Sequence, residues 1–231
     1  MVVPLCTIAQ NKNVVSSSRY FPKGDKIQQS EKALAAHAQK YHNGDFHWRV
    51  FTVETGPDAG GYMVVEGPAS WDATDKRGDL GKVHMDDWAG TVQVLLTEKS
   101  SNSFFTFRTD LSTVQLTDYS DKVAINHVYY KPGYYGDMQE SIGNMKKVWE
   151  QSNQTIAVYE SSSSGESQFL IVTRYKQGLK ERDSGFREAL PVRYVKAHGA
   201  EGWNKYIDGL KQMVSNTWAE ILYYKPELSS K

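Results

Sequence analysis

The sequence has a single cysteine, no excess of either charge and no long apolar run. With only Cys6, the chain has no intrachain disulfide framework and no zinc site made of several cysteines. Lys plus Arg and Asp plus Glu number 27 each, so the basic excess typical of proteins that bind nucleic acid or membrane surfaces is missing. No uninterrupted apolar stretch of the sequence is long enough to cross a bilayer as a helix. We therefore predict neither a nucleic-acid partner nor a membrane partner.

Familiar catalytic motifs are missing too. The chain has no glycine-rich phosphate loop, no His-Glu-x-x-His helix and no nucleophile elbow. Asp86 and Asp87 are adjacent carboxylates at an expected helix start, where they oppose the helix dipole favourably, so we interpret them as structural. These patterns predict no metal site and require no cofactor, and they leave open whether the protein is an enzyme.

The first nine residues are apolar, and the chain becomes polar at Gln10. We interpret this segment as the end of a truncated secretory signal, with Thr7-Ile8-Ala9 as a small-x-small cleavage site, although the basic start of such a signal is missing. This predicts an exported protein, periplasmic or extracellular. The alternative is a cytoplasmic protein with an ordinary N-terminal tail.

The strongest positive feature is that the second half of the chain repeats the first. An aromatic strand followed by an acidic-Leu-Ser tail occurs at residues 104–112 and again at 221–229. Before it, both halves show a strand closed by a Pro/Gly turn, an amphipathic helix, two strands and a tryptophan-containing helix. We therefore divide the chain into an N-terminal segment (1–12), a first repeat (13–116) and a second repeat (117–231).

Each repeat has the order β-α-β-β-α-β, which is the ferredoxin-like plan. The strands before the aromatic strand are expected at residues 14–21, 48–55 and 62–67, and at 123–130, 155–161 and 168–175. Helices would cover one face of each sheet and leave bare the other, which carries side chains such as Phe51 and Phe105. Face-to-face packing buries both bare faces. The expected fold class is thus α+β, with two tandem ferredoxin-like repeats forming an intrachain barrel of antiparallel strands.

This element order, the paired tryptophan-containing helices and the Asp-Leu-Ser and Glu-Leu-Ser tails resemble the dimeric α+β barrel superfamily. That superfamily includes antibiotic-biosynthesis monooxygenases, their haem-degrading relatives and stress-responsive barrel proteins. The resemblance covers nearly the whole chain after Asn13. Because two chains form the barrel in single-copy relatives, this chain is expected to be a monomer with an internal pseudo-dimer, or a homodimer.

For function, the resemblance implies a small hydrophobic or aromatic ligand in a cavity between sheet and helices. If the protein is an enzyme, it implies a monooxygenase-like oxidoreductase. One alternative is a non-catalytic structural or stress-related interaction protein. Another is a haem-binding or haem-degrading barrel. Separately, the strand face of His127 and Tyr129 either lines a cavity or packs into a filled sheet interface.

Two histidines occupy similar places in the two halves. His84 lies four residues before Trp88, and His198 lies five residues before Trp203. In the haem-degrading relatives a histidine on this helix ligates the iron, while an asparagine on the first strand and a tryptophan complete the site. The resemblance therefore makes haem one cofactor option, with Asn126 as the matching asparagine. A histidine at a helix entrance is also often an ordinary surface residue.

A second candidate site lies on the strand expected at residues 123–130. Asn126 and His127 are neighbours on it and point to opposite faces, so only one of them faces the barrel interior. Three histidines are candidates for proton transfer, namely His127, His198 and His84. Six residues are candidates for ligand binding, namely Asn126, Tyr129, Arg174, Trp203, Trp88 and Tyr20.

The remaining charged and histidine positions are less specific. Arg19, Arg49 and Arg174 fall within expected strands, where each either meets an acidic partner or points inward to anchor an anion. His37, His42 and His47 flank the first helix and are expected to be solvated.

Overall fold

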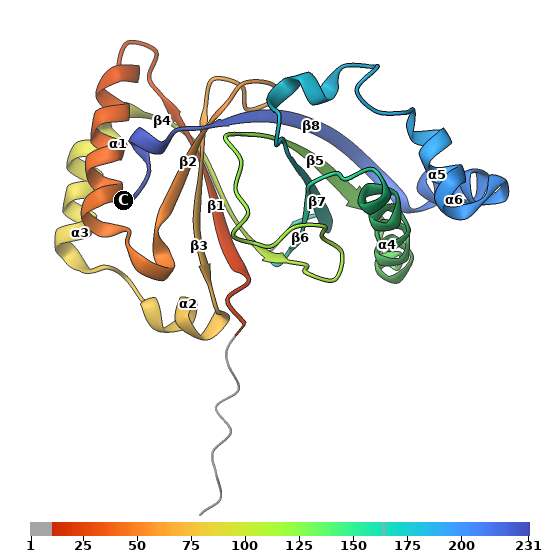
Figure 1. Ribbon diagram of the computed structural model, residues 1–231. Coiled ribbons are helices and arrows are strands. Elements are labelled where there is room, and N and C mark those ends of the chain that lie inside the picture. Colours follow the sequence, from red (N-terminus) through yellow and green to blue (C-terminus); the bar gives the residue numbers. More distant parts are fainter. Residues whose placement is uncertain (1–10, 164) are drawn as a thin grey trace, which may run out of the picture.

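Eight antiparallel strands close into a barrel in the computed structural model, which describes residues 11–163 and 165–231 (Figure 1). Their order around the barrel is β1-β3-β2-β8-β5-β7-β6-β4. The strands are β1 (Val14–Pro22), β2 (Trp48–Val53), β3 (Tyr62–Ala69), β4 (Leu96–Phe107), β5 (Lys122–Tyr130), β6 (Ile156–Ser161), β7 (Gln168–Arg174) and β8 (Val214–Tyr224). The closed α+β barrel expected from the sequence is thus confirmed. The expected signal segment, residues 1–9, lies outside the described residues.

Alternating side chains from the two halves fill the barrel. The main interior core takes residues from all eight strands, including Val15, Phe51, Met63, Phe105, Val123, Ile125, Ala157, Leu170 and Leu222. The bare sheet faces expected from the sequence therefore do bury each other. The halves join at two short seams, where residues 51–53 of β2 pair with β8 and residues 105–107 of β4 pair with β6.

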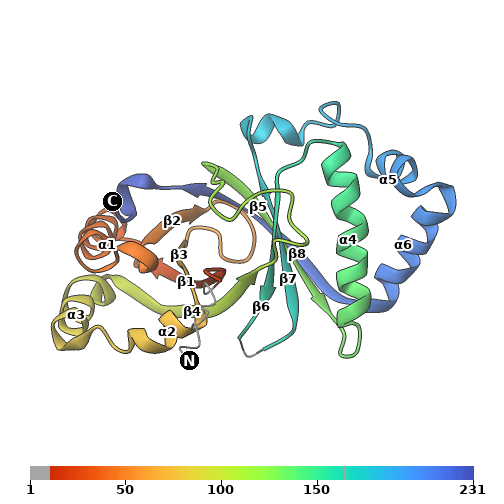
Figure 2. The same ribbon diagram turned by 60° about the horizontal axis from the view of Figure 1, so that its bottom comes forward.

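Helices cover the outer faces of the barrel on opposite sides (Figures 1 and 2). The first side carries α1 (Ile27–Tyr41), α2 (Trp71–Arg77) and α3 (Gly81–Asp87), and the second carries α4 (Tyr135–Gln151), α5 (Leu190–His198) and α6 (Ala200–Met213). On the first side, Leu34 and Ala38 of α1 pack on the sheet. On the second, Met138 and Ile142 of α4 pack against Phe169 and other sheet residues. None of the described helices is both long and apolar enough to cross a membrane.

The two acidic-Leu-Ser tails each dock on the opposite half of the chain. Leu111, after β4, is buried in the cluster under α4, and the Ser112 hydroxyl accepts a hydrogen bond of 2.8 Å from the backbone N–H of Val158. Leu228, after β8, is buried in the cluster under α1, and the Ser229 hydroxyl accepts one of 2.9 Å from Val50. The repeated tail motif therefore has the same structural task in both halves, which is to tie each half to the other.

Candidate functional site

A cavity of about 730 Å³ lies between the outer face of the second-half sheet and its helices. The wall is mostly apolar, with Met138, Ile142, Met145 and Trp149 of α4 facing residues of the sheet. The sheet presents alternate positions of three neighbouring strands, namely Ala124, Asn126 and Val128 of β5, Ile171 and Thr173 of β7, and Thr217 and Ala219 of β8. The cavity between sheet and helices that the resemblance implies is therefore present.

The charged groups that line this cavity are all positive. They are Arg182, Arg193 and Lys211, and no Asp or Glu lines it among the described residues. Arg193 donates from Nη1 to Ser152 Oγ at 3.1 Å, and burial lowers the pKa of its guanidinium, which remains charged at neutral pH. Lys211 is exposed and pairs with Asp208 at 2.9 Å. Apolar walls with a few cations match a partly apolar anion.

Groups suited to proton transfer near neutral pH are missing from the cavity wall. Tyr206 lines it, but burial raises the pKa of the Tyr206 hydroxyl to about 12, so that this group stays protonated. No histidine lines the cavity in the part of the chain that the structure describes. The wall can therefore bind and orient a ligand more readily than it can exchange a proton with it.

Of the candidate residues for this side of the barrel, Asn126 alone lines the cavity. His198, on α5, has Nε2 2.8 Å from the backbone carbonyl of Asn144, to which it donates. Trp203 packs on the rings of Tyr194 and Tyr206, with centroids 5.7 Å away in both cases.

Haem, the cofactor option raised by the resemblance, does not fit these residues. A haem iron needs an axial donor from the protein, most often a histidine. The matching histidine, His198, directs Nε2 at a helix carbonyl, and no other histidine of the described chain reaches the cavity. This cavity therefore has no histidine that could serve as an axial ligand to haem among the described residues.

His127 faces the barrel interior, opposite to Asn126, as the strand alternation predicts. Its Nε2 donates to Glu220 Oε1 at 3.0 Å, and its Nδ1 lies 3.1 Å from Gln168 Oε1. Its ring stacks on Trp218 at 3.7 Å, and the Tyr129 hydroxyl accepts from that indole at 3.4 Å. Both nitrogens of His127 are thus engaged in an internal network.

The three strand arginines also point inward, and they differ in their partners. Arg19 forms a two-point ion pair with Glu220, which is 1 % exposed. Arg174 donates to the backbone carbonyls of residues 115, 116 and 118 and to the Tyr159 hydroxyl. Arg49 donates to the Gly67 carbonyl at 3.0 Å and lies over the Tyr119 ring. Arg174 and Arg49 have no carboxylate partner among the described residues. Backbone carbonyls and aromatic side chains contact their guanidinium groups instead.

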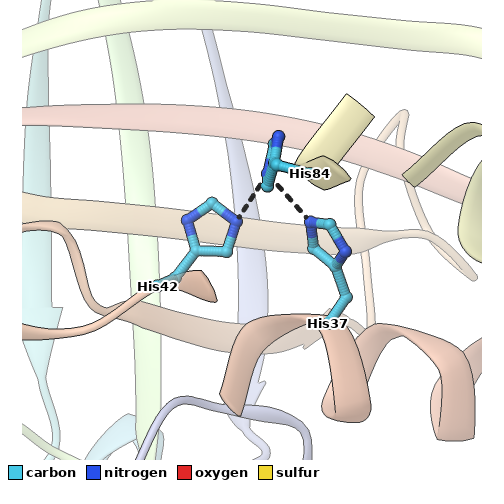
Figure 3. Close-up of side chains that lie close together, drawn as sticks. All are labelled: His37, His42 and His84. Atoms are coloured by element: carbon cyan, nitrogen blue, oxygen red, sulfur yellow. Dashed lines mark hydrogen bonds between the residues drawn. The ribbon is translucent and has the colours of Figure 1, made fainter. Parts of the chain in front are cut away.

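The first half brings together three histidines that are far apart in the sequence (Figure 3). His37 lies on α1, His42 directly follows that helix, and His84 lies on α3. The expectation that His37 and His42 are solvated is wrong, because they are only 1 % and 2 % exposed. Rings of Trp48 and Trp88 cover them, with Trp48 stacked on His42 at 3.6 Å and Trp88 5.1 Å from His37. Trp88 in turn contacts Tyr20, the remaining ligand-binding candidate, at 5.2 Å.

Two carboxylates orient the imidazole rings of His37 and His42. Asp87 Oδ2 accepts from His37 Nδ1 at 2.8 Å, and Glu66 Oε2 accepts from His42 Nδ1 at 3.0 Å. Burial lowers the pKa of His37, of His42 and of His84, and for His37 and His42 it outweighs the carboxylate hydrogen bonds, so the neutral imidazoles are favoured. The placement of Asp87 at a helix start is also corrected, because α3 ends at this residue.

No local sequence pattern identifies this group of histidines. His37 and His42 are five residues apart and straddle a helix end, whereas ligand pairs on one helix face are spaced by three or four. His84 joins them only because α3 packs over the end of α1. The sequence pattern does not group the cations of the cavity either, because Arg182, Arg193 and Lys211 come from separate elements.

No protein-family model matches this chain, and no curated protein matches its sequence. Solved structures do match its fold over nearly the full length. An anthrone oxidase-like protein shares 9 % identity over 93 % of this chain and 92 % of its own, with a TM-score of 0.59. A protein of Fusobacterium nucleatum subsp. nucleatum, provisionally described as a monooxygenase, shares 13 % identity over 91 % of both chains, with a TM-score of 0.56.

A third match is the chlorite dismutase of Candidatus Nitrospira defluvii in complex with imidazole. It shares 8 % identity over 95 % of this chain and 94 % of its own, with a TM-score of 0.55. At these identities the comparisons establish the fold alone. The chain is thus similar in fold to an anthrone oxidase-like protein and to a chlorite dismutase.

Proposed function

We propose that this protein binds a small, partly apolar anion in the cavity between the second-half sheet and its helices. The observation that carries the proposal is the composition of the wall, which is apolar except for a few polar side chains and three cations. An aromatic carboxylate, sulfonate or phenolate has the matching chemistry. Arg193 would hold the anionic group while α4 and the sheet enclose the rings.

Oxidation of the bound molecule is a second candidate, supported by the fold neighbours described as a monooxygenase and as anthrone oxidase-like. Since no histidine of the described residues lines the cavity, a cofactor-independent reaction would depend on a ligand that loses its own proton readily. The similar element order of the halves and their matching tails support a tandem duplication that forms an internal pseudo-dimer.

Two dyes that differ mainly in charge test the site. Anilinonaphthalene sulfonate is anionic and phenylnaphthylamine is neutral, and both fluoresce strongly in apolar surroundings. Ala219→Trp should weaken binding of both dyes, because residue 219 is exposed on the cavity floor and the indole occupies part of the space. Arg193→Gln should weaken only the anionic dye, about 5–10-fold, which is the loss of about 1 kcal/mol from a partly exposed charge pair.

Matched variants outside the cavity provide the controls. Lys196→Gln removes a cation from the same helix as Arg193, and Ala59→Trp adds an indole at an exposed loop position. Both should bind the dyes as the wild type does. Unchanged binding by Ala219→Trp would place the dyes elsewhere and refute the proposal.

A further inference from the structure

The three clustered histidines of the first half direct the same atom at one point. His37 Nε2 lies 3.1 Å from His84 Nε2, and His84 Nε2 lies 3.4 Å from His42 Nε2 (Figure 3). All three ligand atoms lie within 4.8 Å of one another. Nitrogens bound to one tetrahedral zinc ion at about 2.0–2.1 Å are separated by about 3.3–3.4 Å, so these spacings approach those of a coordination sphere.

The hydrogen bonds on the far side of the rings determine which nitrogens carry lone pairs. A carboxylate can only accept, so Asp87 and Glu66 require a proton on Nδ1 of His37 and of His42. Arg77 Nη2 is also 3.3 Å from His42 Nδ1, but a protonated Nδ1 cannot accept, and the shorter contact to Glu66 decides. In the neutral rings both Nε2 atoms therefore present lone pairs towards His84.

Hydrogen bonds within the trio cannot satisfy this arrangement. Neutral His84 has one N–H, so its Nε2 can donate to only one of the two neighbouring lone pairs. A cation at the point where the three Nε2 atoms meet would use all three lone pairs at once, and carboxylate-oriented imidazoles are the usual environment of such an ion.

We propose that His37, His42 and His84 bind a divalent transition-metal ion through Nε2. Three imidazoles suit Zn²⁺ and its first-row neighbours. No fourth His, Cys, Asp or Glu joins the trio as a donor within residues 11–163 and 165–231. The fourth position would thus belong to a water or a ligand atom, which is the pattern of catalytic rather than structural zinc sites.

A second cavity reaches this position. It measures about 380 Å³ and is lined by His42 and His84 together with Glu66, Arg77 and Phe46. Arg77 pairs with Glu66, and Lys40 pairs with Asp87 at 3.2 Å, so each orienting carboxylate is already neutralised by a cation. The ion would keep its full positive charge, and an anionic fourth ligand, hydroxide or the carboxylate of a small molecule, is favoured.

Metal binding is tested on tag-free protein that has been stripped with a chelator. Titration with Zn²⁺ against a chromophoric chelator should show one ion per chain, and Co²⁺ should give the intense visible bands of tetrahedral coordination. His84→Ala should lower the Zn²⁺ affinity about 100-fold or more. His47→Ala should leave it unchanged, because His47 is bonded to the Gly44 carbonyl away from the trio.

The test does not depend on substituting the fully buried His37 or His42, whose variants could fail to fold. His84 is only partly buried on a seven-residue helix, so His84→Gln and His84→Ala should unfold at the same temperature as metal-free wild type. No bound ion, or equal affinity in these variants, would overturn the proposal. Dye binding in the second-half cavity should be the same in His84→Ala, so the two proposals can fail separately.

The orienting carboxylates give a further expectation. Glu66→Gln and Asp87→Asn should each lower Zn²⁺ affinity about 10–100-fold with the stoichiometry unchanged, because they fix the ring tautomer and raise ligand basicity. They should also shift the visible bands of the Co²⁺ form, which a purely structural role would leave unmoved. Asp86→Asn is the matched control, because Asp86 is exposed and pairs with Lys82. Equal affinities in all three variants would contradict the assigned positioning roles.

Discussion

Glu220→Leu should lower the free energy of unfolding by about 3–5 kcal/mol, the usual cost of removing one partner of a buried ion pair. Glu220 accepts from Arg19 of β1 and from His127 of β5, and its side chain is fully buried. Without it, the Arg19 guanidinium is left charged and unpaired inside the barrel. Chemical denaturation with urea measures the change, provided the slope of the transition stays the same.

Two comparison variants identify the cause. The double variant Arg19→Met with Glu220→Leu should recover much of the loss, because no charge of the pair remains buried. Asp208→Asn, which breaks an exposed pair with Lys211, should change stability by less than about 1 kcal/mol. A Glu220→Leu protein as stable as the wild type would show that the ion pair does not stabilise the barrel.

The same carboxylate predicts a dependence on pH. Burial opposes ionisation of Glu220, but the hydrogen bonds from His127 and Arg19 outweigh it and hold the pKa of the carboxyl below its ordinary value. A lowered pKa in the folded state means that this contribution is present above the unfolded pKa of about 4.3 and is lost as the pH falls through the folded value. Glu220→Gln should therefore show a weaker loss of stability in acid than the wild type.

Phe169→Ala should also destabilise the protein by about 3–5 kcal/mol, through the loss of a buried ring and the space it leaves. Phe169, on β7, is fully buried and lies between the sheet and the start of α4. Its ring is 5.6 Å from Tyr130 and stacks on Tyr135 at 6.1 Å. Urea unfolding followed by tryptophan fluorescence measures the difference.

Phe186→Ala is the control for this substitution. Phe186 lies in the loop before α5 and is partly exposed, with the Arg187 guanidinium over its ring. Its removal should have a much smaller effect, about 1 kcal/mol or less. Similar losses in the two variants would show that the packing under α4 is not the source of the stability assigned to it.

The barrel could be predicted from the sequence because its signals are local and repeated. Alternating apolar residues mark the strands, and the bare sheet faces they imply have few ways to avoid water. The prediction that Asn126 and His127 point to opposite sides is confirmed for the same reason, since strand alternation fixes it.

The sites were harder to predict because tertiary packing, and not spacing, brings their residues together. His37 meets His84 because α3 lies against the end of α1, and the cations of the cavity come from separate elements of the second half. The resemblance pointed to His84 and His198 as equivalents. The structure gives them different surroundings, with two imidazoles beside one and a helix carbonyl beside the other.

A barrel closed within one chain is released from a constraint that symmetry imposes on two-chain barrels. When identical subunits form a barrel, every substitution appears twice, and a change that improves one outer face must also be tolerated on the other. Here β1 to β4 and β5 to β8 are separate stretches of one sequence, so each face can mutate alone. One side can acquire a histidine while the other loses it, with the shared interior left untouched. The two outer faces can then take on different functions within a single polypeptide.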